Sequence, residues 1–311
     1  MTLDALGLQE ISDPNATSKT WPFALLRRGA TAESYSAFYE AKGLRSYWLR
    51  SLLAPISAAR WRRYITALHA RVGAQPPWAR VLAKPLRSYL RQGLAPRKRV
   101  AILIETYDWL QARFSPAILK RLCDNESLEL VTLEARKGSR YTVFLTTAVN
   151  VALQREGELG LFIAKSATDV MLCRLAMTFT QINGRVVLAI GGLQGPPSAN
   201  KRDVIDATRE LHGLRPKDAA LLAARAFAQS LGLEEAHAVS DANHVLNRLQ
   251  DTAKFSNYDG YWQERGATAG GPFGYVFPAL QTGEPEDANK RGAIKQAIVA
   301  ASQEFVKNNG Q

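Results

Sequence analysis

Cysteine is scarce in this sequence, and the spacing of its two cysteines excludes two classes of protein. Among 311 residues only Cys123 and Cys173 carry thiols, and they do not form a Cys-x-x-Cys pair. This spacing argues against a zinc site and against a disulfide framework. We therefore expect no metal centre, and the two thiols fit a reducing, cytoplasmic compartment.

Long apolar runs are also missing. No run approaches the roughly 18 apolar residues that span a bilayer. The first ten residues contain Asp4 and Glu10, and they lack the basic start and apolar core of a signal peptide. With 46% apolar and 22% charged residues, the composition is that of an ordinary globular protein.

Acidic residues are absent from one long segment. Between Glu40 and Glu105 there is no Asp or Glu, whereas the segment contains 14 of the 40 Lys and Arg residues. The rest of the chain holds 26 basic and 28 acidic residues, so the net charge of +12 comes entirely from this segment. A block of one sign attracts anionic partners.

Three interpretations of this basic block stay open. In the first, an anionic membrane surface or envelope precursor contacts its arginines, while the apolar stripe of segment 55–72 enters the lipid interface. In the second, the stripe packs on the core and the arginines are solvated. Nucleic acid, the third, is disfavoured because no recognition motif or regular alternation of basic and aromatic residues is present. The arginines are Arg60, Arg62, Arg63 and Arg71, and the stripe is Trp61, Ile65 and Leu68.

The spacing of apolar residues divides the chain into four parts. Residues 1–20 are polar and predict a loose start. Residues 21–125 predict a basic helical region, because apolar residues recur there at helical spacing; its helices are expected at 31–41, 55–72, 81–92 and 100–114. Residues 126–280 predict an α/β core, and residues 281–311 predict a C-terminal amphipathic helix.

The expected core begins with strand-like runs between residues 128 and 191. Asn183-Gly184 lies between the last two runs and predicts a hairpin, because both residues tolerate positive φ. A strand at 186–190, a helix at 216–231 and a strand at 236–240 follow the pattern of a βαβ unit. In such sheets ligands collect beyond the carboxyl ends of the strands, which here carry a glycine cluster and His244.

Four short segments occur in a fixed order: Ile190–Gly195, Leu211–Lys217, Val239–Ser240 and Tyr258–Glu264. They resemble motifs of the VirK/YbjX family of bacterial proteins, and the resemblance covers roughly residues 30–275. The domain of that family has no known function, and its members are associated with virulence and with resistance to cationic antimicrobial peptides in enteric bacteria. The resemblance implies a role at or near the cell envelope and supplies no catalytic residue.

The order of the core elements also resembles, more distantly, the GNAT acyltransferase core. In that fold acyl-CoA lies between two parallel strands that splay apart, and a helix N-terminus faces its pyrophosphate. The resemblance implies an α+β or α/β fold, with a GNAT-like mixed sheet and flanking helices after the basic region, and acyl-CoA or an aminoacyl donor as cofactor. The chain departs from the pattern, because Gly213–Lys217 has one glycine and a proline, and an insertion at 198–211 separates strand from helix.

Six residues near the expected splay are candidates for holding the donor. The glycines can expose the strand backbone to a ligand, or they can serve a tight turn. The two cations can grip phosphates at the start of the helix, an end that otherwise disfavours positive charge. The candidates are Gly191, Gly192, Gln194, Gly195, Arg215 and Lys217.

Three residues are candidates for catalysis. His244 follows a strand end and can act as a general base, since imidazole titrates near neutral pH, although a lone histidine beside a loop is often structural. Tyr258 and Glu264 lie in an aromatic cluster, where a carboxyl group beside Trp262 can act as an acid or base. The alternative is that the aromatic residues are core and Glu264 forms a surface ion pair. Cys173 has no histidine partner in its motif and is not expected to be a nucleophile.

We expect a cytoplasmic protein, peripheral to the inner membrane, that transfers an acyl or aminoacyl group to an envelope or lipid-linked substrate. The alternative is a non-catalytic protein that docks on anionic membrane or on a protein partner through its basic region. The two hypotheses differ in one respect: only an enzyme would need Glu264 and Arg215.

Overall fold

The computed structural model describes residues 44–45, 47–196, 200–246, 257–278, 280 and 289–310 of the chain. Residues Tyr39–Gln311 form one compact unit, which holds both the basic helices and the sheet. The predicted loose start at 1–20 and the predicted helix at 31–41 lie outside the described residues.

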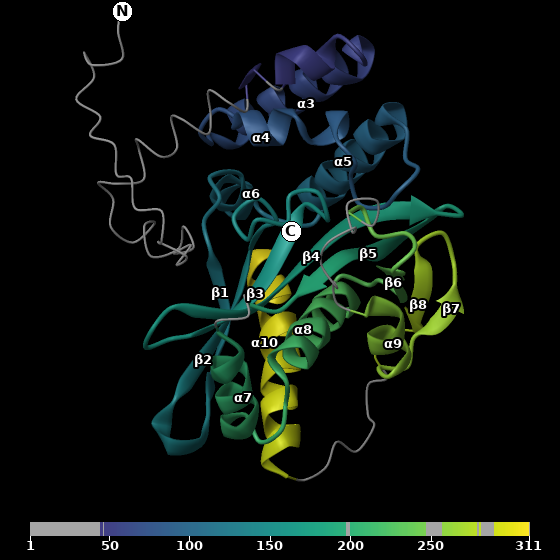
Figure 1. Ribbon diagram of the computed structural model, residues 1–311. Helices are drawn as coiled ribbons and strands as arrows, with labels where there is room; N and C mark the ends of the chain where they lie inside the picture. The colour runs from purple at the N-terminus through teal and green to yellow at the C-terminus, as the bar shows by residue number, and fades with distance from the viewer. Residues whose placement is uncertain are drawn as a thin grey trace, which may run out of the picture. The chain divides into compact units, whose positions relative to one another are not determined.

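The core of the molecule is an eight-stranded mixed sheet with the order β1-β2-β3-β4-β5-β6-β8-β7 (Figure 1). The first five strands form an antiparallel meander, β5 and β6 are parallel, and β8 pairs antiparallel with both β6 and β7. The antiparallel meander and the parallel pair β5 and β6 are those that the sequence predicted, whereas β7 and its pairing with β8 were not predicted. The strands are β1 Leu128–Glu134, β2 Arg140–Thr147, β3 Leu159–Lys165, β4 Val170–Ile182, β5 Arg185–Gln194, β6 Glu235–Val239, β7 Thr268–Gly270 and β8 Gly274–Pro278.

The hairpin between β4 and β5 confirms the turn predicted from Asn183-Gly184. Asn183 has φ 51° and Gly184 has φ 79°, the two positive values that a type I′ turn requires. Ile182 pairs with Arg185 across this turn. The turn therefore fixes the register in which the two longest antiparallel strands align.

β5 leaves its parallel neighbour at the glycine cluster. It pairs with β6 over three positions, the last of which joins Ile190 to Ala238. On its other side Ile190 pairs with Met177, and Gly192 pairs with Ala176, so Gly191 is an extra residue in the β5 strand. Such a bulge bends a strand, and beyond it β5 and β6 diverge.

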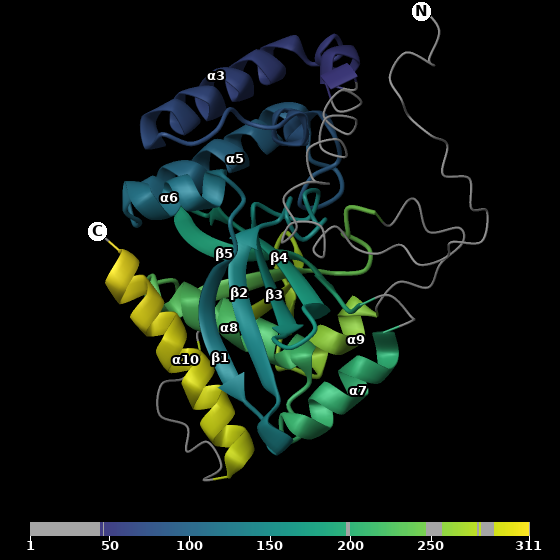
Figure 2. The same ribbon diagram turned by 90° about the vertical axis from the view of Figure 1, so that its left-hand side faces the viewer.

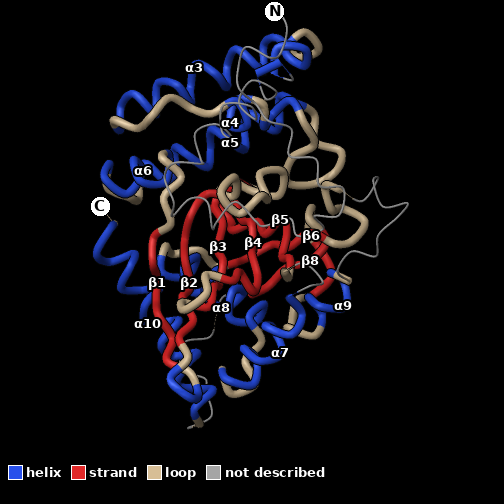
Figure 3. Tube along the Cα trace, turned by 60° about the vertical axis from the view of Figure 1, so that its left-hand side comes forward, coloured by secondary structure: helices blue, strands red, loops and turns tan. Residues whose placement is uncertain are grey.

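Helices cover both faces of the sheet (Figures 2 and 3). On one face α5 packs against β4, and α3 packs on α5 and α6; on the other, α8 packs against β3, β4 and β5, and α10 packs against α8 and β1. The strands alternate accordingly, since Leu188 and Ile190 join the core beneath α8 whereas Ala189 joins the core beneath α3 and α5. The helices are α3 Pro55–Val72, α4 Ala79–Leu82, η2 Lys84–Leu86, α5 Pro96–Gln111, α6 Pro116–Cys123, η3 Arg136–Gly138, α7 Lys201–Glu210, α8 Pro216–Ser230, α9 Tyr258–Gln263 and α10 Lys290–Asn309.

One prediction about the basic region is wrong, and among the interpretations of its apolar stripe, packing on the core is the one that holds. The predicted helix at 81–92 is two short turns, α4 and η2, after which the chain bends at Leu90 with φ 61°. The apolar stripe of α3 does not face a lipid interface, because Trp61, Ile65 and Leu68 are fully buried against α5 and the sheet. Within the described residues, no helix combines the length and apolar character needed to cross a membrane.

Candidate functional site

An acidic loop, Glu156-Gly157-Glu158, lies directly over the bulge where β5 leaves β6. The Glu158 N–H donates to the Met177 carbonyl at 3.0 Å, which holds the loop against β4. A Cβ on Gly157 would lie 2.7 Å from the backbone N and O of Met177, so only glycine allows this approach. The loop therefore delivers two carboxylates to the divergent end of the sheet.

The strand glycines make room for this loop. A Cβ on Gly191 would lie 1.9 Å from the Glu156 carbonyl oxygen, and a Cβ on Gly192 would lie 1.5 Å from Glu156 Oε2. The prediction that this stretch bulges is confirmed. The face of the glycines that was expected to receive a ligand is occupied by Glu156. The loop that carries Glu156 connects β2 and β3, so it is distant from the glycines in the sequence.

Glu156 belongs to a buried chain of polar groups. Its Oε1 accepts a hydrogen bond from Gln194 Nε2 at 2.8 Å, and Gln194 Oε1 accepts one from the Arg174 guanidinium at 2.8 Å. Arg174 also donates to the Val151 carbonyl at 2.9 Å. Burial lowers the pKa of Arg174, and the Glu156 carboxylate opposes this effect. Gln194, a predicted donor-binding residue, thus links a cation to a carboxylate inside the protein.

His244 faces the other oxygen of Glu156. Its Nε2 lies 3.7 Å from Glu156 Oε2, and the two residues are 1% and 2% exposed. Neither atom has a hydrogen-bond partner among the described residues. Buried polar atoms without partners are rare and are often found at functional sites. The Tyr258 ring lies 5.1 Å from that of His244, so the structure brings together these two predicted catalytic residues and adds Glu156.

The slot expected between β5 and β6 is filled by two aromatic residues of α9. The Tyr258 hydroxyl accepts a hydrogen bond from Leu193 N–H of β5 at 3.1 Å, and Trp262 Nε1 donates to the Val239 carbonyl of β6 at 2.8 Å. Their rings stack at 5.6 Å and 9°. Burial and the Glu156 carboxylate raise the pKa of Tyr258 well above its ordinary value. The strand edges and the glycine face at this end of the sheet are thus occupied by the protein's own side chains.

The remaining predicted residues lie outside this cluster. Glu264 has a side chain that is 66% exposed and pairs with Arg265, as the surface interpretation of its motif required. Arg215 is exposed immediately before α8. Lys217 is half-buried with its ammonium 5.8 Å from the Tyr261 ring centre, and burial lowers its pKa. Gly195 lies beside it, because a Cβ there would be 3.7 Å from Lys217 Cε.

Sequence reasoning missed a second buried pair, formed by the other carboxylate of the acidic loop. Lys84 Nζ lies 2.7 Å from Glu158 Oε1, with side chains 2% and 0% exposed, and it also donates to the Gly157 carbonyl at 3.3 Å. The sequence offered one signal for both pairs: Glu156 and Glu158 flank a glycine directly before a predicted strand. In the described parts of the chain, no cluster of three or more His, Cys, Asp or Glu side chains could hold a metal ion.

A separate surface gathers exposed apolar side chains beside the basic helix α3. Leu52, Leu53 and Ile56 are 78%, 86% and 83% exposed. Tyr47 holds the segment in place, since it is buried in a cluster with Ala58, Ala83 and Leu86. Together we call this set the apolar docking surface: Leu44, Trp48, Leu49, Leu52, Leu53 and Ile56.

Arginines border the apolar docking surface. The Arg62 guanidinium lies 5.9 Å from the Trp48 ring centre, and Arg60, Arg63 and Arg71 are exposed on the same helix. No acidic residue occurs between positions 41 and 104. Aliphatic groups and exposed arginines therefore lie side by side here.

The chain matches one family over most of its length. Residues 37–289 match the family described as "Protein of unknown function (DUF535)". The chain is also 25% identical over 293 residues to the "Uncharacterized protein YbjX" of Escherichia coli (strain K12), with 90% of this chain and 86% of that protein covered.

Solved structures give a much weaker likeness. Two mutant forms of a cAMP-binding acyltransferase from Mycobacterium smegmatis align with TM-scores of 0.28 and 0.29 at 9% and 8% identity. Each alignment covers 57% of this chain, and they cover 57% and 56% of the acyltransferase chains. Scores this low carry no conclusion about function. The family match is decisive: the resemblance that the motifs predicted is confirmed, and the chain belongs to the DUF535 family, with YbjX as a relative.

Proposed function

We propose that this protein docks on membranes that contain anionic lipids, through the apolar docking surface and the arginines of α3. The observation that supports this proposal is the exposure of Leu52, Leu53 and Ile56 beside a helix that carries no acidic residue. The docking would occur at the cytoplasmic face of the inner membrane. It agrees with the envelope role that the family resemblance implies, and with the association of that family with virulence and antimicrobial-peptide resistance.

Both halves of this surface contribute energy when it meets a bilayer. A leucine or isoleucine side chain that is fully removed from water contributes about 1.5–3 kcal/mol. Each arginine near an anionic leaflet adds about 1 kcal/mol, and this part weakens with salt. Nucleic acid would use the arginines but would gain little from exposed leucines, since base stacking requires aromatic rings.

Vesicle co-sedimentation tests the proposal. The protein should sediment with vesicles that contain phosphatidylglycerol, and less so with pure phosphatidylcholine or at high salt. Replacing two apolar side chains without changing charge, as in Leu52→Ser/Leu53→Ser, should weaken binding at least about 100-fold, because the two together contribute about 3–6 kcal/mol and each 1.4 kcal/mol is a factor of ten.

Ile205 provides the matched control. It is 47% exposed on α7, away from the apolar docking surface, so Ile205→Ser should bind vesicles like the wild type. Equal losses in both variants, or no vesicle binding by the wild type, would remove the proposal. A wild-type dimer that Leu52→Ser/Leu53→Ser disrupts would reassign the surface to self-association.

Group transfer is the second candidate, and a specific observation favours it. Glu156 and His244 carry unpartnered buried atoms that face each other at 3.7 Å, beside Tyr258. In this proposal His244 removes a proton from an acceptor hydroxyl or amine of an envelope or lipid-linked substrate. As the acceptor bonds to the carbonyl carbon of an activated acyl or aminoacyl ester, the ester oxygen leaves and takes up a proton. Glu156 stabilises the imidazolium.

This chemistry requires α9 to move, since Tyr258 and Trp262 close the splay. A transfer assay with labelled acyl and aminoacyl donors in the presence of vesicles tests it. Activity that Glu156→Gln and His244→Asn abolish, and that the exposed Glu264→Gln leaves intact, is the expected result. Absence of transfer with every donor would leave membrane docking as the function.

A further inference from the structure

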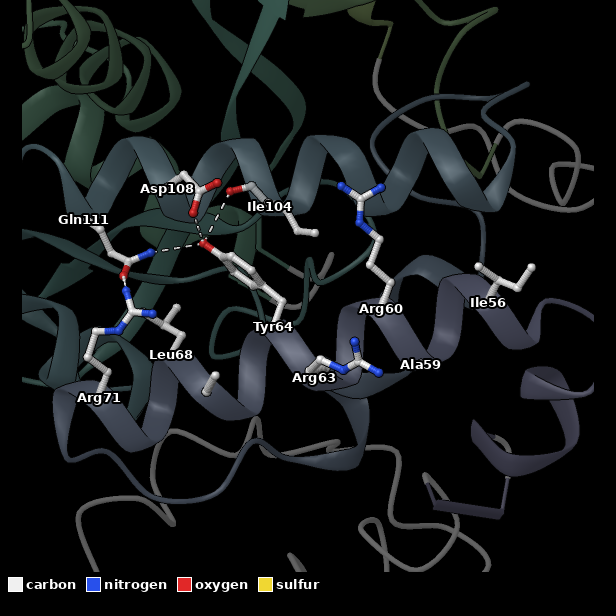
Figure 4. A pocket seen from close by; sticks show the side chains of 11 residues that line it. Ile56, Ala59, Arg60, Arg63, Tyr64, Leu68, Arg71, Ile104, Asp108 and Gln111 are labelled. Atoms are coloured by element: carbon white, nitrogen blue, oxygen red, sulfur yellow. Dashed lines mark hydrogen bonds between the residues drawn. The ribbon is translucent and has the colours of Figure 1, made fainter.

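A groove of about 670 Å³ runs between α3 and α5 (Figure 4). Apolar side chains from both helices line its length, among them Ala59, Ala67, Leu68 and Ile104. Ile56 lines one end and is also part of the apolar docking surface. The groove is therefore continuous with the surface proposed to meet the membrane.

The polar groups of the groove are unevenly satisfied. At one end Tyr64 donates to Asp108 at 2.5 Å, Gln111 Nε2 donates to the Tyr64 hydroxyl at 3.0 Å, and Arg71 donates to Gln111 Oε1 at 2.7 Å. Burial, followed by the effect of Asp108, raises the pKa of Tyr64 well above its ordinary value. This end is a closed network whose one carboxylate already has a donor.

The two arginines toward the other end have no protein partner among the described residues. Neither Arg60 nor Arg63 forms an ion pair or hydrogen bond with another described residue. Figure 4 shows the guanidinium group of Arg60 reaching from α3 toward α5. Three arginines and one aspartate line the groove, so its net charge is +2.

We propose that this groove binds a single anionic phospholipid, with its phosphate on Arg60 and Arg63 and its upper acyl chains along the apolar floor beside Ile56. A guanidinium presents paired N–H donors that match phosphate oxygens. A ligand with an anionic head next to an aliphatic body fits a groove that offers cations beside alanine, leucine and isoleucine. The inference rests on the proposed membrane docking and deepens it, because it assigns a lipid-binding site to the docked face.

A soluble lipid separates this site from docking in general. Dihexanoyl-phosphatidylglycerol, kept below its micelle-forming concentration, should bind the full chain saturably in a calorimetric titration. Arg60→Gln/Arg63→Gln should weaken that binding at least tenfold. The control Arg97→Gln/Lys98→Gln removes the same charge from exposed cations at the start of α5 that line neither the groove nor the apolar docking surface, and it should bind the soluble lipid within about twofold of wild type. Circular dichroism of each variant verifies that it is folded.

The outcomes distinguish the two proposals. Wild-type protein that sediments with anionic vesicles but ignores the soluble lipid overturns the groove and leaves docking in place. Failure to sediment with vesicles overturns docking itself. Inorganic phosphate that binds as tightly as the soluble lipid, or equal losses in both double variants, also overturns the lipid site. Displacement of the soluble lipid by a short DNA duplex would reassign the arginines to nucleic acid.

Discussion

The contact between Gly192 and Glu156 makes a quantitative prediction about the divergent end of the sheet. In Gly192→Ala the new Cβ would lie 1.5 Å from Glu156 Oε2 and 2.6 Å from its Cδ, far inside van der Waals contact. The carboxylate must therefore move and lose its 2.8 Å hydrogen bond from Gln194. Losing a hydrogen bond to a charged group costs about 1.5–3 kcal/mol, and overpacking adds about 1–3 kcal/mol.

We expect Gly192→Ala to lower the free energy of unfolding by about 2.5–6 kcal/mol, the sum of these two effects. For a domain of this size, in which 1 kcal/mol corresponds to about 2 °C, that is a fall in Tm of roughly 5–12 °C. Urea denaturation and calorimetry measure both quantities. Gly195→Ala is the control, because its Cβ would meet Lys217 Cε at an ordinary 3.7 Å, and its unfolding free energy should change by less than about 0.5 kcal/mol.

A double-mutant cycle tests the cause. Glu156→Ala removes the clashing carboxylate, so Gly192→Ala should cost much less in that background than in the wild type. Gly191→Ala should not be rescued in this way, because its Cβ would clash at 1.9 Å with the backbone oxygen of Glu156. Any residue at position 156, alanine included, keeps that oxygen. A Gly192→Ala protein as stable as wild type, or equal rescue of both glycine variants, would refute this account of the glycine cluster.

Three further predictions concern buried ionisable groups. Lys84→Met should destabilise the protein by about 3–5 kcal/mol in urea denaturation, because Glu158 is left buried without its cation; a cost below about 1 kcal/mol would contradict the pairing. Burial lowers the pKa of His69 below 6.5, so the unfolded chain binds the proton first, and stability present above pH 6.5 should fall as the pH drops below it. That fall should be shallower in His69→Gln, and identical pH profiles would show that His69 is not its source. Burial raises the pKa of both Cys123 and Cys173 to about 12, so a thiol reagent at pH 8 should react with neither until the protein unfolds.

The sheet could be predicted in large part because its signals are local. Asn183-Gly184 fixes a turn by backbone conformation alone, and the order of strands, helix and strand follows from the periodicity of apolar residues. The predicted helix at 216–231 is α8, and its alanines are buried where it packs against β3, β4 and β5. These features depend on neighbours in the chain, which the sequence displays directly.

The candidate site could be predicted only in part because its partners are distant in sequence. His244 and Tyr258 were identified, but Glu156 reaches them from a loop between β2 and β3. Nothing in the Tyr258–Glu264 motif shows that its aromatic rings cap Leu193 and Val239 on two different strands.

Helical periodicity on α3 was correctly recognised, but it left open whether the apolar stripe faces the core or a lipid. A stripe such as Trp61, Ile65 and Leu68 has the same spacing whether it faces a core or a lipid, and here it is core. The exposed leucines lie just before the helix, and with Leu44, Trp48 and Ile56 they recur at helical spacing as well. Periodicity therefore identifies an apolar face, whereas only three-dimensional packing shows whether that face is buried or exposed.

Fluorescence quenching by brominated lipid tests the proposed membrane docking most directly. Trp48 lies within the apolar docking surface and is 58% exposed, whereas Trp61 and Trp262 are fully buried. Anionic vesicles with brominated acyl chains should quench part of the tryptophan emission of the wild type, and Trp48→Phe should lose that quenched part. Emission unaffected by the brominated lipid, or equal quenching in Trp48→Phe, would contradict the docking of this surface on a membrane.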